Sequence, residues 1–210
     1  MRWLVLILTL SLSGCFFFGS SDSEEPGDVT SEGVDVENDP LGFISALGSI
    51  GSDLSNLQEE LEAMPDVDPV HFNDLMPVLP EAPSGWTAAD PKGQTTNMAG
   101  TQISNVSQVF TEDDGDGRVE ITISDWAFNK AVYVPFMMQA KFSQETTEGW
   151  SKGITVGEDP GREEFNTQRR SGERTVLHGK RYPIQIKIRN QDAEAFDEWW
   201  KRVQTGELPQ

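Results

Sequence analysis

Hydrophobic and polar residues alternate along several segments of the chain's second half, and this period of two predicts β-strands. The clearest alternation lies in residues 118–125, with the sequence RVEITISD, and in residues 182–189, with the sequence YPIQIKIR. Weaker strand patterns occupy four further runs, namely residues 101–110, 149–157, 162–170 and 174–181. Gly172 and Gly179 mark turns among the later runs. The whole pattern predicts a largely antiparallel sheet of five or six strands.

Apolar residues at helical spacing predict two helices that pack against this sheet. Residues 130–142 hold the densest apolar run, and Pro135 inside it predicts an irregular or late start. A second helix follows Asp192, its expected N-cap. Its apolar stripe repeats at i, i+3, i+4 and i+7 as Phe196, Trp199, Trp200 and Val203. We predict a single α+β domain over residues 66–205, with the central and C-terminal helices covering one face of the sheet.

A heptad pattern of apolar residues precedes the domain, in residues 41–64. Its members are Phe43, Leu47, Ile50, Leu54, Leu57, Leu61 and Met64. This spacing predicts an amphipathic helix, which Asp39 and Pro40 are suited to start and Pro65 to end. Three roles stay open for the 43–64 helix. It packs on its own domain or lies exposed, it self-associates or pairs with a partner helix, or it contacts a membrane surface.

The first 14 residues have the pattern of a signal peptide. Arg2 precedes the predominantly apolar residues 3–12, a run too short to span a bilayer and typical of a signal-peptide core. Residues 12–15, Leu-Ser-Gly-Cys, then match the bacterial lipobox, whose cysteine thiol receives a diacylglyceryl group. Cys15 is the single cysteine of the sequence, so an intramolecular disulfide is impossible. We predict cleavage after residue 14 and lipidation of Cys15, whose acyl chains, such as palmitate, hold the protein on a membrane.

Charge is distributed unevenly along the chain. The formal net charge is −19, and residues 3–91 contain 17 of the 35 acidic residues but no Lys or Arg. Gly, Ser, Pro and acidic residues dominate residues 19–40, so we expect residues 15–40, the lipidated cysteine and an acidic tether, to be disordered. No basic patch is visible in the sequence. Nucleic-acid binding and attraction to anionic lipid are therefore both disfavoured.

The residue types that carry most catalysis are scarce. The two histidines, His71 and His178, are far apart in the sequence, and one cysteine cannot supply a His/Cys metal cluster. His178 precedes Gly179 between predicted strands, where we expect an exposed turn histidine. No phosphate-binding glycine loop of the Walker or dinucleotide type is present. We predict no catalytic, cofactor-binding or metal-binding residues and no cofactor.

The acidic, glycine-containing stretch FTEDDGDGRVEI resembles part of a calcium loop. Positions 1, 3, 5 and 6 of an EF-hand would be filled by Glu112, Asp114, Asp116 and Gly117. Position 12 is Ile123, on the apolar side of a predicted strand, so only half of a site is present. Weak calcium binding by residues 112–120 stays open. We predict that the stretch is the turn of the domain's first hairpin, with Gly115 and Gly117 supplying positive φ angles.

Four stretches of the sequence carry a resemblance to known proteins. They are PVHFNDLMPVLPEAPSGW, VSQVFTEDDGDGRVEITISD, PFMMQAKFSQETTEGWSKGITVG, and GKRYPIQIKI followed by FDEWWKRV. In this order the chain resembles an uncharacterised group of bacterial exported and lipid-anchored proteins, which open with a leucine-proline-x-x-x-x-glycine-tryptophan stretch. The resemblance covers about residues 69–203, and its motifs are structural. It implies the same domain boundary and no particular activity.

These signals together predict a membrane-anchored protein of the bacterial cell envelope. Phe16 follows Cys15, and by resemblance to Gram-negative lipoproteins a residue other than Asp there implies transfer to the outer membrane. We predict a non-catalytic module, not an enzyme, that binds a protein, an envelope polymer or a lipid. The alternative is an envelope hydrolase whose site is not recognisable from sequence. Exposure to the periplasm or to the cell exterior stays open.

Overall fold

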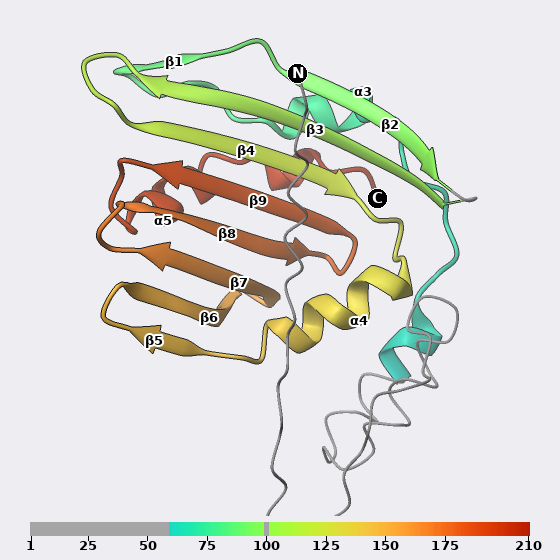
Figure 1. Ribbon diagram of the computed structural model, residues 1–210. Coiled ribbons are helices and arrows are strands. Elements are labelled where there is room, and N and C mark those ends of the chain that lie inside the picture. The colour runs from blue at the N-terminus through green and yellow to red at the C-terminus, as the bar shows by residue number, and fades with distance from the viewer. Residues whose placement is uncertain (1–58, 99–100) are drawn as a thin grey trace, which may run out of the picture. The chain divides into compact units, whose positions relative to one another are not determined.

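The alternating segments of the chain form one antiparallel β-sheet (Figure 1). The computed structural model describes residues 59–98 and 101–210, and nine strands lie within these ranges. They are β1 (Trp86–Ala88), β2 (Lys92–Met98), β3 (Thr101–Glu112), β4 (Arg118–Asp125), β5 (Gln144–Thr146), β6 (Gly149–Val156), β7 (Asp159–Asn166), β8 (Ser171–His178) and β9 (Tyr182–Arg189). The predicted α+β class and antiparallel sheet are confirmed, whereas five or six strands were too few.

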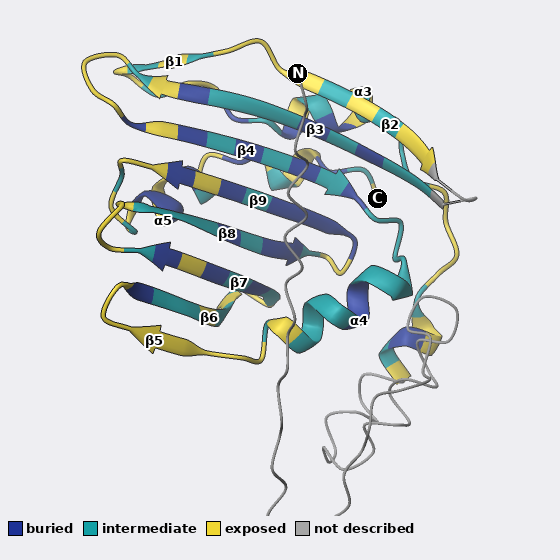
Figure 2. Ribbon diagram, in the orientation of Figure 1, coloured by how far each residue is buried: buried dark blue, intermediate teal, exposed yellow. Residues whose placement is uncertain are grey.

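The two strands with the clearest alternation lie at the centre of the sheet. The strand order is β1–β3–β4–β9–β8–β7–β6–β5, and β2 also pairs with β3. Between β4 and β9 the register partners are Val119 and Ile188, Ile121 and Ile186, and Ile123 and Ile184. All six side chains are at most 1% exposed. Buried residues, dark blue in Figure 2, accordingly recur along the central strands.

The helices lie on both faces of the sheet. They are α3 (Phe72–Leu75), α4 (Lys130–Gln139) and α5 (Ala195–Trp200), with short 3-10 turns η1 (Met76–Val78) and η2 (Thr205–Glu207). Val176 of β8 belongs to the large core beneath α5, whereas its neighbour Leu177 packs with Tyr133 and Val134 of α4. Successive side chains of a strand point to opposite faces. The prediction that the central and C-terminal helices cover one face is therefore wrong.

The ends of the two main helices show how local sequence sets their limits. The side chain of Asn129 caps α4 by accepting a hydrogen bond from the Ala131 amide at 2.9 Å. The expected cap of α5, Asp192, instead pairs with Arg170, with Nε–Oδ1 at 2.9 Å. The N-cap position of α5 is Glu194, which makes no side-chain capping bond. The prediction of Asp192 as the cap is therefore wrong.

Charged side chains fasten α5 to the sheet. Arg174 of β8 binds Glu163 of β7 at 2.8 and 2.6 Å and Asp197 of α5 at 2.6 Å. Trp150 donates its indole N–H to Glu163 at 3.0 Å. Burial raises the pKa of Glu163, but the hydrogen bonds from Trp150 and Arg174 and the charges of Arg174 and Lys152 outweigh it and leave the pKa below its ordinary value. Glu163 is therefore an ionised structural group.

The end of the predicted 41–64 helix packs on the domain. Residues 59–63 are helical, and Leu61 is fully buried in the cluster formed by α4 and β8. Met64 packs against the same cluster, and Glu60 forms an ion pair with Lys180 of the β8–β9 turn. The seam positions before Leu61, the signal peptide 1–14, the tether 15–40 and Cys15 lie outside the described residues.

Candidate functional site

The acidic stretch after β3 is a turn. Residues 113–117 connect β3 to β4, and β2 and β3 already form a hairpin before it, so this is the second hairpin. The Asp113 carboxylate accepts a hydrogen bond from Thr87 at 2.6 Å, and Glu112 accepts one from the Gly117 amide at 3.2 Å. Among residues 59–98 and 101–210, no three metal-ligating side chains gather in one place.

The glycines of this turn serve close packing. Positive φ angles occur at other described glycines but at neither Gly115 nor Gly117, contrary to the prediction. A Cβ atom at either position would instead collide with the Glu112 carboxylate, and one at Gly117 would also collide with the Gln191 side-chain amide and lie 3.1 Å from the Trp86 ring. The two glycines therefore allow the Glu112 side chain to fold back over the turn.

The two histidines lie in structural positions. His71 caps α3, and its Nδ1 accepts a hydrogen bond from the Asn73 amide at 3.2 Å. His178 is the last residue of β8, and its Nδ1 lies 2.6 Å from an oxygen of Asp159, the first residue of β7. It is half-buried, with 34% of its side chain exposed. His178 is thus a strand-end residue with a partner and differs from the exposed turn histidine we predicted.

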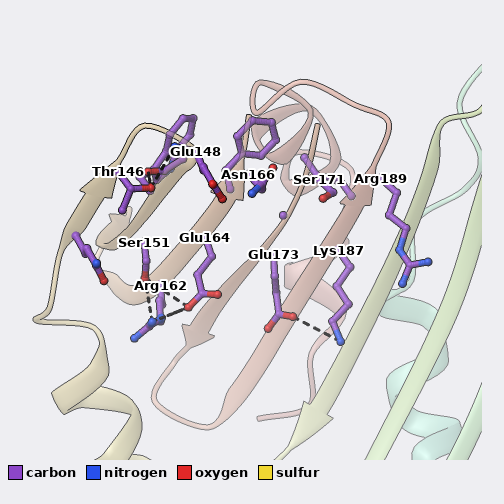
Figure 3. Close-up of a pocket in the computed structure, with 16 residues that line it drawn as sticks. Thr146, Glu148, Ser151, Arg162, Glu164, Asn166, Ser171, Glu173, Lys187 and Arg189 are labelled. Carbon is purple, nitrogen blue, oxygen red and sulfur yellow. Dashed lines mark hydrogen bonds and ion pairs between the residues drawn. The ribbon is translucent and has the colours of Figure 1, made fainter. Parts of the chain in front are cut away.

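The face of the sheet that carries α4 is polar over strands β5 to β9 and contains a hollow of about 680 Å³ (Figure 3). Its polar lining comes from five strands and the turn after β5: Gln144, Thr146, Glu148, Ser151, Arg162, Glu164, Asn166, Ser171, Glu173, Lys187 and Arg189. The side chains form rows across the strands because every pair is in antiparallel register. We refer to this surface as the open face.

The middle row of the open face is a chain of hydrogen-bonded charges. Arg162 donates to Glu164 at 2.9 Å and to the Ser151 hydroxyl at 2.9 Å (Figure 3). On the next strands, Glu173 accepts from Gln185 at 2.7 Å and pairs with Lys187 at 3.5 Å. Glu164 and Glu173 therefore already have cationic partners, whereas Glu120 of β4, which lies opposite Lys187, forms no ion pair within the described part of the chain.

An outer row of the open face runs parallel to these charges. Thr146, Gly149, Asn166, Ser171, Arg189 and Arg118 follow one another as register partners from β5 to β4. The row begins with neutral hydrogen-bonding groups and ends in two arginines. Gly149, at a φ of +151°, is required where β5 turns into β6, because a Cβ atom there would collide with the Phe165 carbonyl oxygen.

No family model, no curated protein and no solved structure matches this chain. The described residues also include no helix long and apolar enough to cross a membrane. The open face is therefore interpreted from its own chemistry alone.

Ser151 carries a signal that the sequence analysis missed. It is the serine of Gly149-Trp150-Ser151-Lys152-Gly153, which fits the nucleophile-elbow pattern G-x-S-x-G. A nucleophile elbow is a sharp turn between a strand and a helix, whereas these five residues lie within the continuous strand β6. The Ser151 hydroxyl contacts Arg162 and Glu164, and neither described histidine is among its partners. The pattern therefore occurs without the structure that activates such a serine.

Proposed function

We propose that this protein is a lipid-anchored module of the bacterial cell envelope whose open face binds a polar ligand. The observation that carries the proposal is the open face itself. A solvated sheet face is ordinary in an antiparallel sheet, but here the polar side chains of five strands line an open hollow of about 680 Å³. Arg162 is paired with Glu164 and Lys187 with Glu173 in the middle row, and such paired polar groups suit hydrogen bonding to a polar chain.

The anchor rests on the lipobox at residues 12–15 and on the resemblance to exported proteins. Two or three acyl chains on Cys15 bind a membrane stably, because burial of each methylene contributes about 0.8 kcal/mol. Phe16 after the cysteine supports the outer membrane as the destination. The acidic tether before the domain would separate the open face from the lipid surface.

Replacing Cys15 with alanine is expected to abolish lipid attachment and to leave the unprocessed precursor. The thiol is the acceptor of the diacylglyceryl group, so no other side chain substitutes for it. Incorporation of labelled fatty acid and membrane fractionation in the native host would measure the change, with globomycin-treated wild type as the reference. If Cys15→Ala were labelled and fractionated like the wild type, the prediction that Cys15 carries the lipid anchor would be wrong.

A photoreactive amino acid at Gln144 is expected to form an adduct in cells, because Gln144 is exposed at the rim of the hollow. Lys201, exposed after α5 and outside the lining of the hollow, is the matched control position. Adducts at Gln144 and not at Lys201 would support a ligand on the open face. Equal adduct formation at Gln144 and Lys201 would contradict specific binding of a ligand to the open face.

The hydrolase alternative is favoured by one observation, the match of Ser151 to the nucleophile-elbow pattern. The cells used for crosslinking also allow the hydrolase alternative to be tested. Labelling of Ser151 by a fluorophosphonate probe, lost in Ser151→Ala, would replace the binding proposal with an enzymatic one. Because Arg162 and Glu164 hold the hydroxyl in hydrogen bonds on a regular strand, we expect no such labelling.

A further inference from the structure

Two arginines face each other at the end of the outer row. Arg118 is the first residue of β4, Arg189 is the last residue of β9, and the two are direct register partners. Their Cβ atoms are therefore about 4.5–5.5 Å apart, as for any directly opposed antiparallel pair. Both residues are exposed. Arg189 lines the hollow at this end of the open face (Figure 3), and Arg118 is its register partner on β4.

Among the residues that the structure describes, Arg118 and Arg189 have no carboxylate partner, unlike the neighbouring basic side chains. Within the described part of the chain, neither Arg118 nor Arg189 forms an ion pair with a carboxylate. Other basic residues of β7 to β9 do so: Arg162 with Glu164, Arg174 with Glu163, and Lys187 with Glu173. Like charges directly opposite each other destabilise a sheet. Arg118 and Arg189 therefore form an unfavourable like-charged pair, whereas the neighbouring basic residues are paired with carboxylates.

The neighbours of the pair add hydrogen-bond donors. Ser171 is the register partner of Arg189, and Asn166 is the partner of Ser171. The Asn166 side-chain oxygen already accepts from the Arg169 amide at 2.8 Å, so its NH₂ group is left to donate. Carboxylates also lie near the pair: Glu120 is on the same face of β4, opposite Lys187, and Asp113, Asp114 and Asp116 belong to the turn that leads into Arg118. The outer row thus offers hydrogen-bond donors from Asn166 and Ser171 and positive charge at its arginine end.

We propose that Arg118 and Arg189 bind an oxyanion, a carboxylate or a phosphate group, carried by the ligand of the open face. Two arginines at directly opposed positions supply N–H donors for such a group, since each guanidinium can bind a carboxylate or phosphate in bidentate geometry. Binding of an anion between the two arginines would offset the repulsion between their charges. The proposal rests on the proposed function and narrows the ligand to a polar chain that bears acidic groups.

Titration of the full-length protein in a neutral detergent with inorganic phosphate, and separately with acetate, tests the pair directly. Amide chemical shifts of β4 and β9 report binding at constant ionic strength. The double variant R118Q/R189Q is expected to raise the dissociation constant at least tenfold. Arg202→Gln removes the same kind of charge from an exposed position after α5 and is expected to leave the dissociation constant unchanged.

The outcomes separate this proposal from the proposed function. Equal weakening by Arg202→Gln and by the double variant would show only general charge attraction and would overturn the arginine site. The site would also be overturned if the double variant lost binding to vesicles containing phosphatidylglycerol but kept its affinity for phosphate and acetate, since the pair would then serve the lipid surface. In either case the adduct at Gln144 would remain, so failure of the arginine site would not be mistaken for failure of the open face.

Discussion

Replacing Asp125 with alanine is expected to lower the free energy of unfolding by about 3–5 kcal/mol, as for other broken buried ion pairs. Asp125 is fully buried at the end of β4, and its carboxylate binds Arg181 at 2.9 and 2.8 Å. It also accepts hydrogen bonds from the amides of Ala127 and Val70 at 2.8 and 2.9 Å. One carboxylate therefore connects three segments, and its loss leaves a buried guanidinium and two amides unpaired.

Urea denaturation of Asp125→Ala and wild type would measure this loss. Asp197→Ala is the matched control, because Asp197 also pairs with a buried arginine, Arg174, but 66% of its own side chain is exposed. Arg174 keeps Glu163 as a partner in that variant, so we expect a change of at most about 1 kcal/mol. Similar shifts of the denaturation midpoint in both variants would contradict the role we assign to Asp125.

Trp199→Ala is expected to cost about 3–5 kcal/mol, the range for removal of a buried large aromatic side chain. Trp199 is 3% exposed and joins α5 to the far strands of the sheet. Its ring lies 4.6 Å from the Phe110 ring of β3 and 5.1 Å from the Trp86 ring of β1, measured between centroids. Truncation would open a cavity that these rigid rings cannot fill.

The adjacent tryptophan provides a control of the same residue type. Trp200 is only partly buried at the edge of the same cluster, so Trp200→Ala removes less contact and is expected to destabilise the protein clearly less than Trp199→Ala. Thermal unfolding followed by circular dichroism compares the two variants. A larger loss for Trp200→Ala would show that the described packing of α5 is wrong.

The strands predicted from the sequence are those with one apolar side. β4 and β9 alternate cleanly because one side of each packs in the core and the other is solvated. β5 has no buried residue, and β2, with the sequence KGQTTNM, has no apolar alternation. In β2, Gly93 faces the core as a bare backbone because the Phe72 ring occupies the space of a side chain. Such strands leave little hydrophobic signal.

The positions of the helices and of the candidate site depend on which strands pair and on which residues lie opposite each other. The sequence alone does not show which strands are neighbours, so it does not show these positions. Leu177 is an example for the helices: it packs against α4 on one face of the sheet, whereas its neighbour Val176 belongs to the core on the face of α5. Arg118 and Arg189 are an example for the candidate site. They are far apart in the sequence, with no run of basic residues around either, and become neighbours only because β4 pairs with β9. Linear charge patterning therefore missed this basic pair.

The β5 margin of the sheet is a poor template for strand addition, and the opposite margin is interrupted. β5 is three residues long and fully exposed, and on the opposite side β1 and β2 share the length of β3 with Pro91 between them. Proline has no N–H to donate, and short or interrupted edges offer few consecutive backbone groups to another chain. The lipid anchor that we propose would concentrate many copies in the plane of a membrane, where crowding favours edge-to-edge joining of sheets. The short β5 edge and the edge interrupted at Pro91 would hinder the sheets of neighbouring molecules from joining. The open face of each molecule would then stay accessible.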